Sequence, residues 1–405
     1  MSAMVTAEPP PLELLHAILR ERHGDLVARV SDVQMEPIAS GGYSGNPLYR
    51  VRVSRAGGSP AAASRPATFV LKRWLPGGHG ERLLGVDRPL EALAWARGIL
   101  QASSLPPGVV VPFLGVRLDP SGDAAWILMK DVSASLDAYS RERPLPPAEA
   151  VERIKLALDG LARLHAWWEH PARQASLRRY SGLVPLERFA WCQAASYAAV
   201  LGRRAPVGVA PGGPVTDELR ANVRAFLDWL PAGDRPVFEA ILYRRGRLAG
   251  ALGALPRTLI HGDADDRNVG LRLPAGARPA AGTATPLAEL VLIDWEWIGV
   301  GPAALDVARL CGSAAALCDR SEPVPDAIFS DELPDHYFAC YRAHGGALLD
   351  RADWRRSFDL ALLAGGLTQI PFAGSMIRHG MAPVMAAFER QLERLIPTAK
   401  ALAVA

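Results

Sequence analysis

Two stretches of sequence decide the fold: Thr258–Leu271, TLIHGDADDRNVGL, and Leu290–Leu310, LVLIDWEWIGVGPAALDVARL. Each begins with an apolar run of strand length, and each run ends directly at polar residues. The first run is followed by His-Gly-Asp, which contains Asp263, and the second delivers Asp294. Asn268 follows Asp263 by five positions. We therefore expect two strands that place oxygen-bearing side chains at their ends.

These oxygen-bearing side chains are suited to metal-assisted phosphoryl transfer, where a protein mainly positions groups and neutralises charge. Asp263 can accept the proton of a substrate hydroxyl, while Asn268 and Asp294 can hold Mg²⁺ against the phosphates of ATP. The predicted cofactors are ATP and Mg²⁺. Taken singly, each residue is also typical of an ordinary surface turn.

A second His-Gly-Asp tripeptide, His23-Gly24-Asp25, shows what chance produces. No apolar strand precedes it, and Val30 stands where the asparagine would be. The sequence holds three asparagines, and one of them is Asn268. The combination, rather than the tripeptide, carries the prediction.

The pattern HGDxxxxN, followed by an apolar run, IDW, a glutamate and a later aspartate, resembles the aminoglycoside phosphotransferase and choline kinase family. That family is similar in fold to the protein kinases. The resemblance implies that Asp263 is the catalytic base and that Asn268 and Asp294 bind Mg²⁺. It also implies that His261 supports the catalytic loop and that Asp306 is a structural acid.

The N-terminal half offers candidates for the nucleotide-binding groups of a kinase: a glycine-rich turn, a lysine and a carboxylate that fixes the lysine. The turn is SGGYSGN, from residue 40 to residue 46, and Lys72 lies in the strand-like run FVLK. Glu91 is preferred to Glu81 as the partner of Lys72, because apolar neighbours place Glu91 in an amphipathic helix. The predicted nucleotide-binding residues of this region are Gly41, Gly42, Ser44, Lys72 and Glu91.

The segment Ile127–Asp131 resembles the hinge that contacts adenine through backbone groups, which adds Met129 and Asp131 to the predicted nucleotide site. Leu161–Ala166, LARLHA, resembles a helix segment that precedes the catalytic loop in this family. The metal motif reads Asp-Trp-Glu instead of Asp-Phe-Gly, and no APE-like segment follows it. Both departures disfavour a protein kinase.

The resemblance implies an α+β, bilobal, protein-kinase-like fold, and the patterns along the chain agree with it. Residues 1–132 are expected to form a small β-rich N-terminal lobe that binds nucleotide. Its expected elements include a helix over 88–101 and one strand over 109–118. Residues 133–405 are expected to form a larger helical lobe that holds the catalytic loop and the acceptor. Expected helices there are 147–169, 217–229 and 235–254.

Composition excludes several partners. The net charge of +3 comes from 45 basic and 42 acidic residues, without a block of Lys and Arg that would bind nucleic acid. No signal peptide is visible, and the apolar runs noted are shorter than the ~20 residues needed to span a bilayer. The four cysteines lack metal-ligand spacing, which suits a reducing cytoplasm. The oligomeric state stays open.

The expected acceptor is a small molecule with a hydroxyl group, such as an aminoglycoside, a choline-like amine, a sugar or a related metabolite. The acidic segment 319–335 is either an edge that attracts a cationic substrate or simply a solvated loop. Five tryptophans could either form a wall that binds a cationic substrate or pack in the core: Trp167, Trp168, Trp191, Trp229 and Trp354. The leading hypothesis is an ATP- and Mg²⁺-dependent small-molecule kinase, and the alternative is a nucleotide-binding regulatory pseudokinase without turnover.

Overall fold

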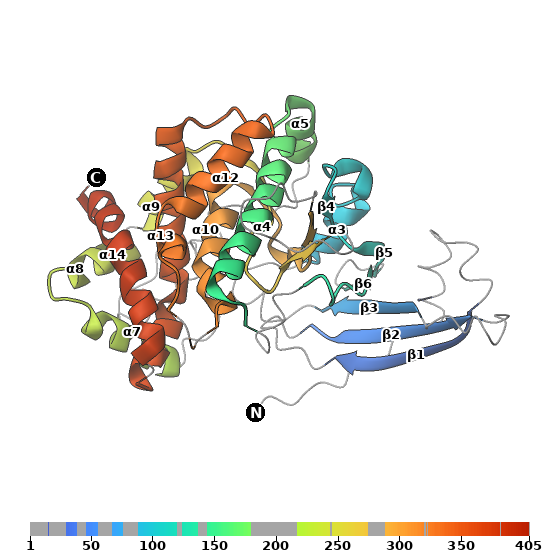
Figure 1. Ribbon diagram of the computed structural model, residues 1–405, viewed down its shortest axis with the longest axis horizontal. Coiled ribbons are helices and arrows are strands. Elements are labelled where there is room, and N and C mark those ends of the chain that lie inside the picture. The colour runs from blue at the N-terminus through green and yellow to red at the C-terminus, as the bar shows by residue number, and fades with distance from the viewer. Residues whose placement is uncertain are drawn as a thin grey trace. The chain divides into compact units, whose positions relative to one another are not determined.

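The computed structural model divides into two compact units (Figure 1). The first unit comprises Met1–Arg82, Val86–Ser104 and Val111–Ala134, and the second comprises Leu83–Gly85, Leu105–Val110 and Ser135–Ala405. Within them the structure describes residues 15, 30–38, 46–55, 67–75, 88–119, 124–136, 144–179, 217–243, 245–273, 288–319, 321, 323–380 and 382–404.

The first unit contains a five-stranded sheet in the order β1-β2-β3-β6-β5, and all neighbouring strands are antiparallel. The strands are β1 (Val30–Ile38), β2 (Leu48–Arg55), β3 (Ala67–Trp74), β5 (Phe113–Leu118) and β6 (Ala125–Lys130). Helix α3 (Leu90–Ala96) and the short 3₁₀ helix η2 (Ala102–Ser104) lie between β3 and β5 along the chain.

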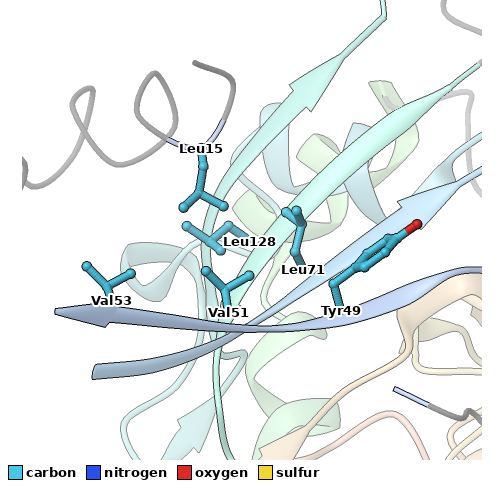
Figure 2. Packing of buried hydrophobic residues seen from close by; sticks show 6 residues of the cluster. All are labelled: Leu15, Tyr49, Val51, Val53, Leu71 and Leu128. Carbon is cyan, nitrogen blue, oxygen red and sulfur yellow. The ribbon is translucent and has the colours of Figure 1, made fainter. Parts of the chain in front are cut away.

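One face of this sheet carries a hydrophobic cluster. The alternating residues Tyr49, Val51 and Val53 of β2 contribute to it, as the period of two in the sequence predicts. Leu71 and Leu128 add side chains from two further strands, and the N-terminal Leu15 packs on the same cluster (Figure 2). The six cluster residues are at most 7% exposed, so this face is a core.

Two predicted elements of this region are wrong in extent. The helix expected over 88–101 ends at Ala96, because Gly98 adopts a φ of +85°, which stops an α-helix. The strand expected over 109–118 is divided at Pro112, which has no N–H to donate to a ladder. The part before the proline, β4 (Val109–Val110), belongs to the second unit and pairs there with β9 (Glu289–Leu292), and the part after it is β5.

The second unit is mainly helical. Helix α4 (Pro147–Trp168) packs against both α10 (Ala304–Ser313) and α12 (Glu332–Ala343), as Figure 1 shows. The expected helix over 217–229 is α7 (Asp217–Trp229), and the expected helix over 235–254 is two helices, α8 (Arg235–Tyr243) and α9 (Arg245–Gly253). The other described helices are α5 (Pro171–Arg179), η4 (Trp295–Trp297), η5 (Ala314–Leu317), α11 (Asp326–Phe329), α13 (Arg351–Arg378) and α14 (Ala382–Val404). The predicted α+β class is confirmed.

Short strands in the second unit carry the two motifs Thr258–Leu271 and Leu290–Leu310. β7 (Thr258–Ile260) pairs with β10 (Gly299–Gly301), and β8 (Val269–Arg272) pairs with β9 (Glu289–Leu292). β9 also pairs in parallel with β4. Because β8 and β9 are antiparallel, the residue that precedes β8 and the residue that follows β9 are neighbours.

Helix α13 is the one helix in the described part of the chain that is long and apolar enough to span a membrane. Half of its apolar window is buried inside the structure. The helix packs against α7, α10 and α14, which accounts for its apolar side chains as those of a core helix.

Candidate functional site

The first unit brings together Lys72 and Glu91, the predicted lysine–carboxylate pair. Lys72 lies on β3, and Glu91 lies in the first turn of α3. Lys72 Nζ and Glu91 Oε1 are 2.5 Å apart, and the two residues are 4% and 0% exposed. Withdrawing two charges from water is costly, so the pair depends on close contact and on further hydrogen bonds. Glu81, the rejected alternative, lies outside the described residues.

The predicted glycine-rich turn falls largely outside the described residues, and Gly41, Gly42 and Ser44 are among those not described. The last residue of the turn, Asn46, is described and buried. Its Oδ1 accepts a hydrogen bond from the backbone N–H of Leu75 at 3.3 Å. The end of the turn is therefore attached to the chain that leaves β3.

The two predicted hinge residues lie at the end of β6. Met129 is buried and pairs with Val70 of β3 and with Phe113 of β5. The Asp131 carboxylate accepts hydrogen bonds from both N and Oγ of Ser133, at 3.1 and 2.6 Å. The side chain of Asp131 thus forms a local turn, as aspartates do at strand ends.

In the second unit, Asp306 of α10 organises the loop that follows β7. Its carboxylate accepts hydrogen bonds from His261 N at 2.7 Å, Gly262 N at 2.8 Å and His165 Nε2 at 3.1 Å. Burial raises the pKa of Asp306, but the hydrogen bond from His165 and the neighbouring His261 outweigh burial, so that the pKa lies below its ordinary value. Gly262 has a φ of +84°, a conformation that glycine adopts without strain.

His261 uses both ring nitrogens inside this loop. Nε2 contacts the carbonyl oxygen of Ile293 at 2.8 Å, and Nδ1 accepts the backbone N–H of Asp263 at 3.2 Å. These partners require the proton on Nε2 of a neutral ring. The arrangement agrees with the role that the sequence predicts for His261, support of the loop rather than proton transfer.

The predicted base, Asp263, is held on both carboxylate oxygens. Asn268 Nδ2 donates to Oδ2 at 3.0 Å and to the backbone oxygen of Asp263 at 2.9 Å. Arg309 Nε and Nη2 lie 3.0 and 2.8 Å from Oδ1. Burial raises the pKa of Asp263; Arg309 opposes the change, and the carboxylates of Asp265 and Asp294 add to it.

The predicted metal ligands Asn268 and Asp294 lie on adjacent chain segments. Asn268 precedes β8 and Asp294 follows β9, and Ile293 N donates to the backbone oxygen of Asn268 at 3.1 Å. Because Asn268 Nδ2 is used in donating to Asp263, Asn268 Oδ1 is the atom that can act as a ligand. Asp294 has a φ of +61°, the one non-glycine residue with positive φ in the described chain, and such conformations concentrate at functional sites.

The carboxylate of Glu296 lies near that of Asp294. One side-chain oxygen of Glu296, in η4, lies within 4.8 Å of an oxygen of Asp294. Carboxylate and amide oxygens are the ligands that Mg²⁺ prefers, and it also keeps several waters and phosphate oxygens. The donor set of Asn268, Asp294 and Glu296 therefore fits a hard divalent cation.

Sequence reasoning missed Arg309 and Asp265. Arg309 Nη2 also contacts Asp265 Oδ2 at 3.3 Å, and Asp265 in turn pairs with Arg267. A signal existed, because Arg309 follows Asp306 by three positions, the spacing of residues that share one face of a helix. The contact itself joins residues 46 positions apart, which no local pattern reveals.

The acidic segment 319–335 is neither a free cation-attracting edge nor a simply solvated loop. Its described acids have partners within the second unit, and four of the five are paired with Arg or Lys, so most of their negative charge is compensated. The partners are Ser321 for Asp319, Arg390 for Asp326, Arg355 and Arg394 for Asp331, Lys155 for Glu332, and Arg351 and Arg355 for Asp335. Glu322 lies outside the described residues.

Two of the five tryptophans considered as a cation-binding wall are buried in the core. Trp168 and Trp354 are 3% and 0% exposed, and Trp354 donates its ring N–H to the backbone oxygen of Pro334 at 2.9 Å. These two are core residues rather than a wall for a cationic ligand. Trp191 lies outside the described residues.

Comparisons with known proteins find relatives by structure. No protein-family model matches the chain, and no curated protein sequence matches it. Ethanolamine kinase from Plasmodium vivax is similar over 98% of this chain and 91% of its own, with 13% sequence identity and a TM-score of 0.50. An amicoumacin kinase gives 14% identity and a TM-score of 0.45, over 98% of this chain and 96% of its own. Choline kinase from Streptococcus pneumoniae gives 12% identity and a TM-score of 0.43, over 94% of this chain and 99% of its own.

At such identities the likeness concerns the fold alone, and the ethanolamine kinase is the comparison that supports it. The β-sheet of the first unit and the mainly helical second unit agree with a kinase-like α+β fold. The chain therefore has the kinase-like α+β fold of the Plasmodium vivax ethanolamine kinase, as the motifs around Asp263 and Asp294 predict.

Proposed function

We propose that the protein is an ATP- and Mg²⁺-dependent kinase that transfers the γ-phosphate to the hydroxyl group of a small molecule. The observation that carries this proposal is the arrangement around Asp263. Asn268 holds the Asp263 carboxylate, and the chain that follows Asn268 pairs with the chain that delivers Asp294. A base and two oxygen ligands in one loop system are the parts that phosphoryl transfer requires.

In the proposed reaction, Asp263 orients the substrate hydroxyl and accepts its proton as the oxygen attacks phosphorus. Burial and the nearby carboxylates raise the pKa of Asp263, which makes it a stronger base than an exposed aspartate. The attack is in line, the bond from phosphorus to the leaving oxygen of ADP breaks, and no covalent enzyme intermediate forms.

Asn268 Oδ1 and the Asp294 carboxylate would hold Mg²⁺, with Glu296 available as a further ligand. When bound, Mg²⁺ supplies positive charge that neutralises the phosphate oxygens. Lys72, fixed by Glu91 at 2.5 Å, is proposed to bind nucleotide phosphate oxygens. The described side chain of Asp131 is engaged with Ser133, so we assign any adenine contact there to backbone groups.

The proposed acceptors are small molecules with a hydroxyl group, a wider class than the substrate of any single structural neighbour. We put amino alcohols first among the candidates, and the name of a structure with the same fold, an ethanolamine kinase, supports this order. Cholines, aminoglycosides and sugars follow, since each offers a hydroxyl group. The ion pairs of the acidic segment 319–335 remove it as an argument for a cationic acceptor.

The test is consumption of Mg·ATP over a panel of amino alcohols, sugars and aminoglycosides, with wild type, Asp263→Asn and a matched control. The control is Asp159→Asn, since Asp159 is an aspartate of α4 that pairs with Arg163 and His344 away from the loop. We expect turnover stimulated by one acceptor class, a loss in kcat of about 10²- to 10⁴-fold for Asp263→Asn, and unchanged kcat for the control.

Two outcomes would contradict the proposal. Acceptor-stimulated turnover that survives in Asp263→Asn would remove Asp263 as the base. Tight binding of Mg·ATP without stimulation by any acceptor would favour the alternative, a regulatory pseudokinase.

A further inference from the structure

Helix α10 presents one polar stripe to the loop that carries Asp263. Asp306, Arg309 and Ser313 are spaced by three and four residues, so they share a face of the helix. Asp306 binds the backbone N–H groups at the start of the loop, and Ser313 Oγ accepts the N–H of Asp266 at 3.0 Å. These two members of the stripe hold the loop backbone, and Arg309 lies between them in sequence.

We propose that Arg309 is a positioning residue that fixes the carboxylate of Asp263 for transfer, an inference that rests on the proposed function. Its Nε and Nη2 contact one oxygen, Oδ1, at 3.0 and 2.8 Å. Asn268 Nδ2 contacts the other oxygen, Oδ2, at 3.0 Å. Donors on both oxygens, from two different elements, prevent the carboxylate from rotating about its own bond.

The same contacts select the oxygen that receives the proton. A carboxylate offers about four lone-pair sites, two on each oxygen. In the described part of the chain, Oδ1 of Asp263 accepts a hydrogen bond from Arg309 Nε and forms an ion-pair contact with Arg309 Nη2, whereas Oδ2 accepts one hydrogen bond from Asn268. The remaining site on Oδ2 is the one to which a substrate hydroxyl can donate.

Arg309 is itself held in place. Its Nη2 lies 3.3 Å from Asp265 Oδ2, so that the guanidinium lies between two carboxylates. The side chains of Asp263, Asp265 and Arg309 are 16%, 5% and 24% exposed, which shields the contacts from water. A planar guanidinium with fixed N–H directions defines an orientation that a lysine ammonium does not.

The chain offers a matched control in Arg267. Arg267 also contacts Asp265, with its Nε 3.1 Å from Oδ2, whereas the described hydrogen bonds to the Asp263 carboxylate come from Asn268 and Arg309. Arg267→Ala removes one guanidinium charge beside Asp265, as Arg309→Ala does. It leaves both contacts of Arg309 with Oδ1 of Asp263 in place.

The experiment combines crystal structures with kinetics for wild type, Arg309→Ala, Arg309→Lys and Arg267→Ala. In Arg309→Ala we expect the Asp263 carboxylate to take a second orientation and to lose its contact with Asn268 Nδ2. We expect kcat to fall on the order of 100-fold with the KM for nucleotide within about twofold, because misplacement by about 1 Å has this effect. Guanidinium ion should restore part of kcat, Arg309→Lys should be intermediate, and Arg267→Ala should match wild type within about twofold.

Three results would overturn the inference: an unmoved Asp263 in Arg309→Ala crystals, an unchanged kcat, or a loss confined to the KM for nucleotide. If Arg309→Ala does not fold, Arg309→Lys supplies the same comparison, since one ammonium cannot make both bonds. If wild type shows no turnover with any acceptor, the proposed function fails, while the orientation of Asp263 in the variant crystals still decides whether Arg309 positions it.

Discussion

Lys72 and Glu91 form an ion pair that is almost completely withdrawn from water. Their side chains are 5% and 1% exposed. Each charge in such a pair depends on the other, because neither is solvated on its own. A residue exchange that removes one partner therefore acts on stability as well as on any nucleotide contact.

We expect Lys72→Met to lower the free energy of unfolding of the first unit by about 3–5 kcal/mol, because the buried Glu91 carboxylate loses the positive charge of Lys72. The double variant Lys72→Met/Glu91→Leu should recover most of that loss, since it removes both charges. Urea denaturation of wild type, both single variants and the double variant measures the coupling. Additive losses in the double variant would show that the pair is not coupled.

Asp306 makes stability depend on pH. Its folded pKa lies below its ordinary value, so its contribution is complete above the unfolded value of about 4 and is lost as pH falls through the folded pKa. Asp306→Asn should therefore be less stable than wild type at pH 7, by about 1–3 kcal/mol for the lost charged hydrogen bonds. The difference should shrink below about pH 4.

Urea midpoints across this pH range test the prediction. Asp326→Asn is the control, because the Asp326 carboxylate is 86% exposed in its pair with Arg390 and should contribute little. A difference between wild type and Asp306→Asn that stays constant down to pH 2 would show that the charge of Asp306 does not stabilise the loop.

At the scale of elements, the crossing of α7 and α13 depends on one glycine. A Cβ added at Gly374 would lie 1.8 Å from the backbone oxygen of Asn222, so the two helices approach backbone to backbone there. At Gly365, on the same helix, an added Cβ meets no atom within 4 Å. The two positions separate the effect of packing from that of helix propensity.

Gly374→Ala should lower the melting temperature, since forcing the helices apart costs about 1–3 kcal/mol. Gly365→Ala should raise it slightly, because alanine is favoured over glycine in a helix by up to about 1 kcal/mol. Thermal melts of both variants give the comparison. Equal shifts of the same sign would mean that the crossing adjusts without strain.

For the whole molecule, the proposed metal ligands predict how ligand binding changes stability. Mg·ATP at about 100 times its Kd should add about 2.7 kcal/mol to the unfolding free energy. Asp294→Asn should lose the part of this gain that requires Mg²⁺, because an amide is a weaker ligand than a carboxylate. The measurement is the melting temperature with ATP, with and without Mg²⁺.

Asp319→Asn is the control for this experiment, as Asp319 is an aspartate whose carboxylate accepts bonds from Ser321 in the acidic segment. It should keep the full Mg²⁺-dependent rise. A full rise in Asp294→Asn would show that the metal is held elsewhere.

The sequence by itself determined the α+β class and the order of the motifs. Apolar runs of strand length and amphipathic helices are local patterns, so the strands that carry Lys72, Asp263 and Asp294 could be predicted from them. The pairing of Lys72 with Glu91 was also predicted, from their order along the chain. Element ends were less predictable, because single residues such as Gly98 and Pro112 decide them.

Only the tertiary structure decided which distant side chains meet. The contact of Arg309 with Asp263 and the ion pairs of the acidic segment 319–335 join residues from separate helices and loops. Charge patterns along a sequence do not show such partners, because the partner is chosen by how helices pack. The sequence thus determined which charged side chains the chain carries. The packing of α10, α13 and α14 decided which arginines pair with Asp263 and with the acids of segment 319–335.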